Sequence, residues 1–227
     1  MWFKKYVQSK FYFLKKRIVK QRGQIGPNSE LGRWITLLSS LDSVKNIVEF
    51  GVWNGRGSSL CILQGVEKRI IKKEVSILGF EINKEKYEEA RKVLRKSTNY
   101  VLLYGGILDL DDNFLELNNL TKVEDEWWVI DQKNLETSSN YFTRVPLQID
   151  LLILDGGEFT SYSEFKKLES RCKGFIVLDD IKVRKNRRVH FELSSNFSWA
   201  CITSEDERNG YSIWRYGISK GSLVKEN

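Results

Sequence analysis

The sequence predicts an α/β fold in which a mostly parallel sheet is covered by helices on both faces. Short apolar runs alternate with longer amphipathic segments over most of the chain. These runs are nearly continuous in their apolar character, which is typical of parallel strands that are buried on both faces. A glycine-rich stretch at residues 47–59, IVEFGVWNGRGSS, indicates a strand, a tight turn and the start of a helix.

Length and composition indicate one globular domain. The chain has 227 residues, of which 41% are hydrophobic and 30% are charged, which is enough to bury a large core. No apolar run approaches the ~18–20 residues that a membrane span needs. Cys61, Cys172 and Cys201 match neither a zinc signature nor a disulfide framework, so we expect a reducing compartment and a cytoplasmic protein.

Positive charge is concentrated at the N-terminus. Residues 1–22 contain eight lysines and arginines and no acid, within a net charge of +7 for the whole chain. Apolar residues at helical spacing from Phe3 to Ile18 predict a basic amphipathic helix. We expect residues 1–27 to form an arm that packs on the domain or on a partner such as a glycosyltransferase, or that lies peripherally on an anionic membrane. The domain itself would span residues 28–227.

Strands and helices are expected in regular alternation. The first helix, 30–41, would begin at a cap formed by Asn28 or Ser29. The last two strands flank a polar turn and should pair antiparallel. The sheet would therefore have seven strands, mostly parallel with a C-terminal antiparallel pair, which is the Rossmann-like architecture of class I S-adenosylmethionine methyltransferases. The expected strands are 46–50, 75–80, 100–104, 149–154, 174–178, 198–203 and 211–216, and the other helices are 58–70, 84–96, 161–171 and 185–195.

The glycine-rich turn predicts a nucleotide-type ligand. Gly51, Gly55 and Gly57 allow close approach of the backbone, because glycine lacks a Cβ and tolerates positive φ. Glu49, two residues before the first glycine, suits a ligand with ammonium and sulfonium groups and would repel the pyrophosphate of NAD. The alternative is that Glu49 is a strand-end acid that bonds only the loop.

Two further strand ends extend this ligand site. Glu81 follows the second strand, where a carboxylate can accept hydrogen bonds from ribose hydroxyls. Gly105 and Gly106 follow the third strand and would leave room for an adenine ring, although such a pair is often only a turn. We therefore predict S-adenosylmethionine as the ligand. The predicted binding residues are Glu49, Gly51, Trp53, Asn54, Gly55, Ser58, Ser59, Glu81, Gly106 and Asp155.

Three aspartates are expected to meet at one edge of the sheet. Asp155 ends the fourth strand, while Asp179 and Asp180 end the fifth, which should be its neighbour. Unpaired carboxylates this close raise one another's pKa values, and a hard divalent ion such as Mg²⁺ would relieve the repulsion. The alternative is that Asp179 or Asp180 caps the next helix or pairs with a nearby cation. The candidate cations are Lys182, Arg184 and Lys185.

These motifs resemble the metal-dependent O-methyltransferases that act on sugars, including the macrocin-type enzymes and the cephalosporin-hydroxylase-like branch. The resemblance spans about residues 28–217 and is carried by VEFGVWNGRGSS, GFE, ILDGGEFTSYSEF, VLDDI and ERNGYSIW. It implies that Asp155, Asp179 and Asp180 hold Mg²⁺ while a methyl group passes to a sugar hydroxyl. Several members of that family carry a His or Lys base three residues after the first aspartate. Because Glu158 stands there in this sequence, we expect Glu158, Asp155 or Asp180 to accept the proton.

The long connection 105–148 is expected to shape the acceptor site. It is acidic and carries Trp127 and Trp128, with Tyr141 and Phe142 nearby. Aromatic faces and carboxylates commonly stack on and bond to sugar rings, and a long loop in a compact domain is usually functional. The alternative is a small local core beneath a surface loop.

Other functions stay open at this stage. The acceptor could be another small-molecule hydroxyl, such as a catechol or a natural product, or the protein could bind S-adenosylmethionine without methyl transfer. The positive net charge suggests a nucleic-acid methyltransferase, but the acidic connection would repel phosphates and no Pro-Pro-aromatic segment follows Asp155. We therefore expect no specific nucleic-acid partner. His190, the only histidine, is expected to be a packing residue.

Overall fold

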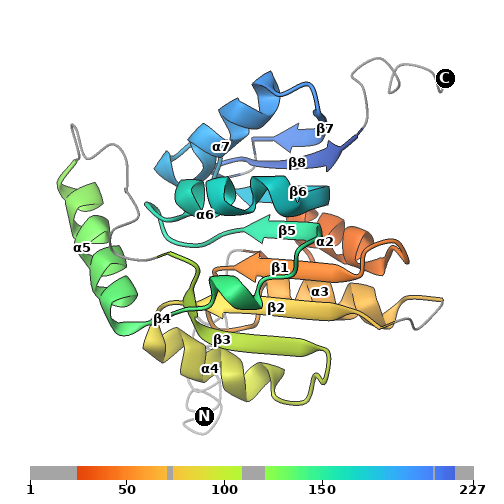
Figure 1. Ribbon diagram of the computed structural model, residues 1–227, viewed down its shortest axis with the longest axis horizontal. Helices are drawn as coiled ribbons and strands as arrows, with labels where there is room; N and C mark the ends of the chain where they lie inside the picture. The colour runs from red at the N-terminus through yellow and green to blue at the C-terminus, as the bar shows by residue number, and fades with distance from the viewer. Residues whose placement is uncertain (1–24, 71–73, 109–120, 207, 218–227) are drawn as a thin grey trace, which may run out of the picture.

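The computed structural model describes residues 25–70, 74–108, 121–206 and 208–217. Its sheet has eight strands in the order β4-β3-β2-β1-β5-β6-β8-β7 (Figure 1). The strands are β1 (Asn46–Phe50), β2 (Ser76–Glu81), β3 (Tyr100–Gly106), β4 (Ser139–Asn140), β5 (Ile149–Leu154), β6 (Cys172–Asp179), β7 (Trp199–Glu205) and β8 (Tyr211–Tyr216). The helices are α2 (Glu30–Ser40), α3 (Ser58–Glu67), α4 (Lys84–Leu94), α5 (Lys122–Thr137), α6 (Ser161–Leu168) and α7 (Arg184–Ser195), with 3₁₀ turns η1 (Phe142–Arg144) and η2 (Glu169–Arg171).

The predicted architecture is confirmed. Strands β1 to β6 pair in parallel, and β8 pairs antiparallel with both β6 and β7. The sheet has one strand more than the seven expected, because the two-residue β4 pairs with Gly105 and Gly106 at the end of β3. These two glycines therefore belong to a strand and not to the turn expected after it.

Helices α2 and α5 each begin after a residue whose side-chain hydroxyl accepts a hydrogen bond from an amide in the first turn. The Ser29 hydroxyl accepts a hydrogen bond from the Gly32 amide at 3.0 Å and caps α2, which settles the choice between Asn28 and Ser29. Thr121 and Glu124 form a reciprocal capping box that begins α5.

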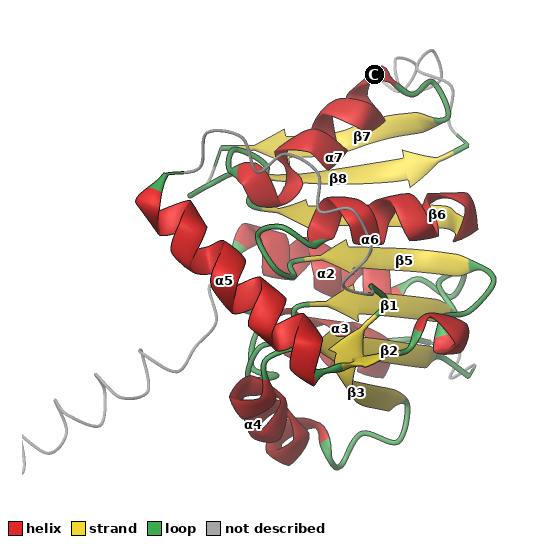
Figure 2. Ribbon diagram, turned by 60° about the vertical axis from the view of Figure 1, so that its left-hand side comes forward, coloured by secondary structure: helices red, strands yellow, loops and turns green. Residues whose placement is uncertain are grey.

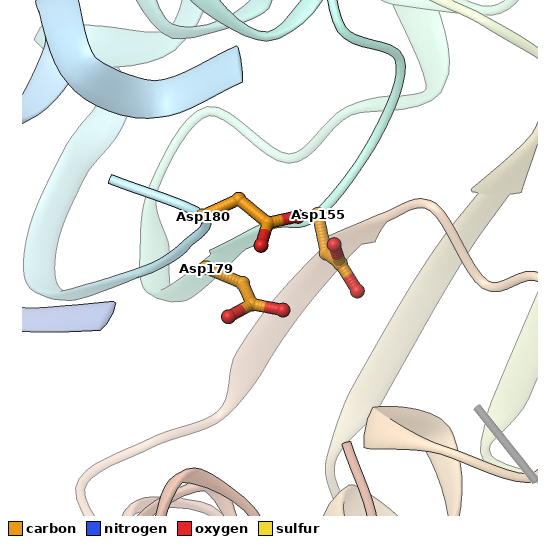
Figure 3. Close-up of side chains that lie close together, drawn as sticks. All are labelled: Asp155, Asp179 and Asp180. Atoms are coloured by element: carbon orange, nitrogen blue, oxygen red, sulfur yellow. The ribbon is translucent and has the colours of Figure 1, made fainter. Parts of the chain in front are cut away.

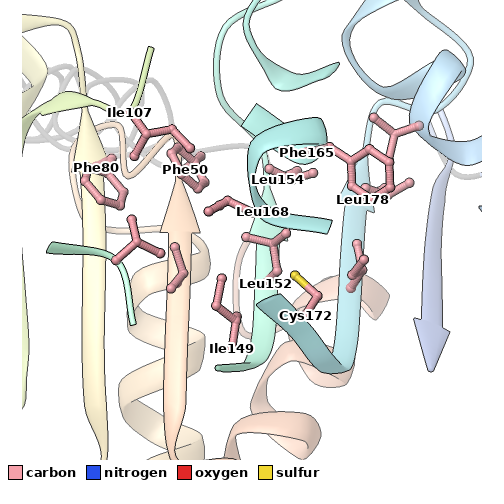
Figure 4. Close-up of a cluster of buried hydrophobic side chains, with 14 of the residues drawn as sticks. Phe50, Phe80, Ile107, Ile149, Leu152, Leu154, Phe165, Leu168, Cys172 and Leu178 are labelled. Atoms are coloured by element: carbon pink, nitrogen blue, oxygen red, sulfur yellow. The ribbon is translucent and has the colours of Figure 1, made fainter. Parts of the chain in front are cut away.

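The core lies in two layers, one on each face of the sheet. Alternate residues of β5 point to opposite faces: Leu152 and Leu154 enter one cluster, and Leu151 and Ile153 enter the other. On the first face, Phe165 of α6 packs near Leu154 (Figure 4). Helices α2, α3 and α4 cover the second face. Burial on both faces explains why the strand sequences are continuously apolar.

The connection 105–148 is not the long loop expected from the sequence. It contains the sixteen-residue helix α5, which lies across the end of the sheet where the parallel strands finish (Figures 1 and 2). Only Asp131 and Leu135 of this helix are buried. The mixed charged and apolar sequence of α5 has no continuous apolar stripe, so periodicity did not reveal the helix.

The basic segment predicted as a helix, residues 1–22, lies outside the described residues. Ile25, placed in the same arm by the sequence, is buried in the core of the domain. The boundary of the domain therefore lies earlier than residue 28. No described helix has the length and apolar character that a membrane crossing requires.

We expect Gly51→Ala to destabilise the protein by at least about 2 kcal/mol, since Gly51 has φ +80° and a Cβ there would lie 1.9 Å from the Asp155 carbonyl oxygen. Gly217→Ala is the matched control, because Gly217 has φ +79° with nothing within 4 Å of the added Cβ. Its cost should be only about 1 kcal/mol. Urea unfolding measures both free energies, and equal losses would contradict the predicted clash.

Candidate functional site

A cavity of about 530 Å³ lies at the carboxyl ends of the parallel strands. Open α/β sheets bind their ligands at this edge, where the strand order reverses beside β1. Helix α5 contributes to one wall of the cavity. The residues that line the cavity include Gly51, Trp53, Asn54, Ser58, Glu81, Gly105, Ile130, Asp131, Asp155, Glu164, Asp179, Asp180 and Lys185.

The glycine turn after β1 forms one wall. Gly51 adopts φ +80°, and its amide donates to the Phe80 carbonyl at 3.1 Å, which brings the ends of β1 and β2 together. Trp53 also has a positive φ, +53°, and its amide donates to Oε2 of Glu81 at 2.6 Å. The turn and the Glu81 carboxylate are thus linked directly, as the sequence predicts for one ligand site.

Glu81 is the buried carboxylate of this wall. Its Oε1 also accepts from the Asn83 amide at 2.8 Å. Burial raises the pKa of Glu81 to about 7, although the two amide hydrogen bonds favour the charged form. A carboxyl group in this position can accept hydrogen bonds from a ligand once it is ionised.

Glu49 lies behind the cavity and is not among the residues that line it, so its expected contact with the ligand stays a prediction. Glu49 shares a face of β1 with Ile47 because side chains alternate along a strand. Its carboxylate is fully buried and accepts hydrogen bonds from the hydroxyls of Ser58, Ser59 and Tyr100. The alternative that Glu49 is a structural strand-end acid is therefore favoured, with hydroxyls in place of loop amides.

The predicted ligand-binding set divides in two. Gly51, Trp53, Asn54, Ser58, Glu81 and Asp155 line the cavity. Glu49, Gly55, Ser59 and Gly106 do not, and ligand contact by these four residues stays a prediction. Gly55 instead allows α4 to approach, since a Cβ there would lie 3.2 Å from Cα of Ala90. Gly105, and not Gly106, reaches the cavity from β3.

The three aspartates meet as predicted. Asp155 follows β5, and Asp179 and Asp180 end the neighbouring strand β6. Their carboxylates point toward a common space, and one oxygen of each lies within 4.8 Å of the others (Figure 3). The convergence is confirmed, whereas the role of these residues as metal ligands stays a prediction.

Two cations of the chain itself neutralise this cluster. Nζ of Lys185 lies 2.9 Å from Oδ1 of Asp155 and 2.8 Å from Oδ2 of Asp180. Nη2 of Arg208 lies 3.1 Å from Oδ2 of Asp179. The alternative of pairing with a nearby cation is thus confirmed for Lys185, while Lys182 and Arg184 pair with other acids.

These pairs decide the charges in the cluster. Burial favours the neutral amine of Lys185, but Asp155 and Asp180 together raise its pKa above the ordinary value. Burial raises the pKa of Asp155 to about 7 even though Lys185 opposes the shift. Burial also acts on Asp180, yet the contact with Lys185 holds its pKa below the ordinary value. At neutral pH the cluster therefore contains an ammonium bound to a carboxylate.

The aspartate cluster has the ligand types of a divalent-ion site but not the free ligand oxygens. Three carboxylates are suitable ligands for Mg²⁺. However, both oxygens of Asp180 accept hydrogen bonds, from Lys185 and from Nδ2 of Asn209 at 3.0 Å. Oxygens of Asp155 and Asp179 are likewise bonded to Lys185 and Arg208. As arranged here, the residues do not fit a divalent ion, because Lys185 bridges Asp155 and Asp180 and a protein donor bonds at least one oxygen of each aspartate.

Glu158 is not among the residues that line the cavity, and its role as the base stays a prediction. Its Oε1 accepts from the Lys185 backbone amide at 3.2 Å, in the first turn of α7. Glu158 therefore satisfies an unpaired amide at a helix N-terminus. In doing so it fixes the backbone of Lys185.

Sequence reasoning missed two buried acids, Asp131 and Glu164. Asp131 accepts from the Phe159 amide at 3.1 Å. Glu164 lies on the buried face of α6 with Phe165 and Leu168, and burial raises its pKa to about 8. An acid on an apolar helix face was the available signal for Glu164. Asp131 had none, since its helix was not predicted.

Backbone strain is concentrated at the cavity. Among the described residues, those other than glycine with positive φ are Trp53, Asp180 and Arg208. The first two line the cavity and the third bonds the aspartates. Such strain is commonly found at functional sites. His190 lies elsewhere, with Nδ1 3.0 Å from the Ser212 hydroxyl oxygen and its ring against Trp214, as expected for a packing residue.

We expect Tyr100→Phe to cost about 1–3 kcal/mol, because it removes a donor from the buried Glu49 carboxylate. Tyr104→Phe is the matched control. The Tyr104 hydroxyl makes only an exposed hydrogen bond to Thr137, so its loss should change stability by less than about 0.5 kcal/mol. Chemical unfolding of both variants tests this, and a neutral Tyr100→Phe would show that Glu49 does not need the hydroxyl.

Comparison with known proteins places the fold. Neither a protein-family model nor a curated protein sequence matches the chain. Among solved structures, an O-methyltransferase from Bacillus cereus in complex with SAH superposes with a TM-score of 0.56 at 12% identity, covering 89% of this chain and 88% of that one. A methyltransferase from Geobacter sulfurreducens superposes with a TM-score of 0.56 at 14% identity, covering 89% of this chain and 86% of that one. A candidate rRNA methylase from Clostridium thermocellum superposes with a TM-score of 0.51 at 12% identity, covering 86% of this chain and 98% of that one. The chain therefore shares the Rossmann-like fold of these methyltransferases.

Proposed function

We propose that the protein is an S-adenosylmethionine-dependent O-methyltransferase whose acceptor is a sugar hydroxyl in a glycoside or glycan. The observation that carries this proposal is the cavity at the carboxyl ends of β1, β2 and β5, where the glycine turn, Glu81 and Asp155 meet. The structural neighbours support the methyltransferase part, and the B. cereus O-methyltransferase was solved with SAH.

The charge of the cavity favours a cationic donor. Among the described residues, six carboxyl groups line it, against the ammonium of Lys185 and the nearby guanidinium of Arg208, which pairs with Asp179. Burial keeps some of these acids partly protonated near neutral pH, but the lining still carries more acids than cations. S-adenosylmethionine carries an ammonium and a sulfonium, whereas NAD and FAD carry a pyrophosphate that this lining would repel. The preference for a cationic ligand, which the sequence predicts from Glu49, is therefore explained by the acids that line the cavity. They are Glu81, Asp131, Asp155, Glu164, Asp179 and Asp180.

The chain's own residues would orient both substrates. When bound, the donor supplies an electrophilic methyl group, whose transfer to the acceptor oxygen breaks the carbon–sulfur bond and leaves its electron pair on sulfur. Glu81 would accept the ribose hydroxyls, and Gly51 would leave room for the donor. Asp155 would accept the proton of the acceptor hydroxyl, because it lines the cavity beside Asp180 and Lys185. Positioning would provide much of the rate enhancement.

Helix α5 supports a sugar acceptor. Trp127 is 44% exposed and lies on the same helix as Ile130 and Asp131, which line the cavity. Exposed indole faces stack on sugar rings. Trp128 instead packs edge-on against Phe159, with the ring centroids 5.3 Å apart. It therefore belongs to a small local core, which was the alternative for this segment. Tyr141 and Phe142 pack on the main core.

Three alternatives follow from the same cavity. A divalent ion held by Asp155, Asp179 and Asp180, as the sequence resemblance implies, could activate the acceptor if Lys185 left its place between Asp155 and Asp180. The acceptor could be another small-molecule hydroxyl, or the protein could bind the donor without methyl transfer. An rRNA acceptor, as in one neighbour's description, is disfavoured because the lining acids would repel phosphates.

We expect calorimetry to show S-adenosylmethionine binding that Glu81→Gln weakens about tenfold or more at pH 8. The loss should shrink at pH 6, because the pKa of Glu81 lies near 7 and its wild-type carboxyl is then largely protonated. Glu85→Gln, on the exposed first turn of α4, is the control. Absence of binding by the wild type would overturn the proposed function, and an equal loss at both pH values would overturn the role of Glu81.

We expect Trp127→Ala to raise the KM for a glycoside acceptor about tenfold while donor binding stays unchanged, because a stacked ring contributes on the order of 1 kcal/mol. Methyl transfer to a panel of deoxysugar glycosides and catechols would measure this effect. Val123→Ala is the control, since Val123 is also exposed on α5. Turnover of catechols alone would contradict the sugar acceptor.

A further inference from the structure

We propose that Lys185 is a built-in cation that takes the place of a divalent ion at the aspartate cluster, so that the site works without metal. This inference rests on the proposed function, because it assigns Lys185 the task of holding the acceptor oxygen. The observation behind it is the position of Nζ between Asp155 and Asp180, where a shared cation would lie.

The fold holds Lys185 in this position from both sides. Its side chain is 14% exposed, and its backbone amide donates to Glu158. The next residue, Asn186, is fully buried, and its Nδ2 donates to the carbonyls of Leu154 at 2.9 Å and Asp179 at 2.7 Å. Asn186 thus fastens the first turn of α7 to the ends of both strands that carry the aspartates. The backbone of Lys185 is thus held beside the strand ends that carry the aspartates.

A second contact set completes the charge balance. Arg208 and Asn209, in the turn between β7 and β8, bond Asp179 and Asp180. Three carboxylates therefore face two cations and one amide, all supplied by the chain. A divalent ion could share Asp155 and Asp180 only after Lys185 had moved away. Displacement would leave a half-buried ammonium without its two partners, which is unfavourable.

The ammonium can perform part of the task of a metal. It has three N–H donors, of which Asp155 and Asp180 take two. The third can donate to an acceptor oxygen in the cavity that Lys185 lines. A donor fixed there stabilises the negative charge that develops on this oxygen as its proton passes to Asp155. No bond to a metal and no change of oxidation state is involved.

Mn²⁺ binding to the full chain, followed by electron paramagnetic resonance, tests the proposal directly. The wild type should bind no Mn²⁺ at the cluster, whereas Lys185→Met should bind it at least about tenfold more tightly, because two carboxylates lose their cation. Adding Asp155→Asn to Lys185→Met should abolish the gain. Lys182→Met is the matched control, since Lys182 pairs with Asp206 outside the cavity. It should bind Mn²⁺ no better than the wild type.

Activity gives a second readout. Wild-type methyl transfer should be unchanged after metal removal by a chelator. Lys185→Met should lose about 100-fold in turnover, because a lost donor to a developing charge costs this much. Mg²⁺ should restore part of that loss in Lys185→Met and should not affect the wild type.

Two results would overturn the proposal. The first is Mn²⁺ binding by the wild type that Asp155→Asn abolishes, which needs no Lys185 variant. The second is a folded Lys185→Met that binds no more Mn²⁺ than the wild type. Failure of the proposed function would give a different result from failure of this proposal. S-adenosylmethionine would not bind, whereas the outcome of the Mn²⁺ binding experiments would be unaffected.

Discussion

The contacts of Lys185 with Asp155 and Asp180 join the ends of β5 and β6 to the first turn of α7. Acids that follow adjacent parallel strands are forced together by the sheet, and their burial weakens the screening of their charges. Removing one partner from such a pair commonly costs about 3–5 kcal/mol. The arrangement of Glu158, Asn186, Arg208 and Asn209 follows from this constraint, since each of them holds either Lys185 or an aspartate in place.

The same constraint explains why the cavity is both acidic and poised to change charge near neutrality. Burial raises the pKa values of Glu81 at the end of β2, Asp155 after β5 and Glu164 in α6. Among the described residues, Lys185 is the cation that lines the cavity, and Arg208 adds a second positive charge beside Asp179. A cationic ligand would therefore restore charge balance in a way that a phosphate ligand could not.

Much of this arrangement was predictable from the sequence, because strand ends are a local signal. The apolar runs located β1, β5 and β6, and the acids that follow them had to converge at one edge. Orientation was harder to predict. Glu49 and Glu81 both lie at strand ends, yet only Glu81 reaches the cavity, because the side chain of Glu49 points beneath α3. Helix α5 lacks an apolar stripe, so Asp131 could not be placed.

The attachment of α5 has a consequence for the order of events at the site. Asp131 and Leu135 are its buried residues, and Trp128 packs on Phe159, so only a small set of contacts among the described residues opposes its local opening. Gly157 is part of this attachment, since a Cβ there would lie 2.6 Å from Oδ2 of Asp131. Amide hydrogens of this helix should therefore exchange with solvent sooner than those of the strands beneath it. Helix α5 lines the cavity and also carries the exposed indole of Trp127. Its local opening would therefore couple the entry of the methyl donor to the selection of the acceptor.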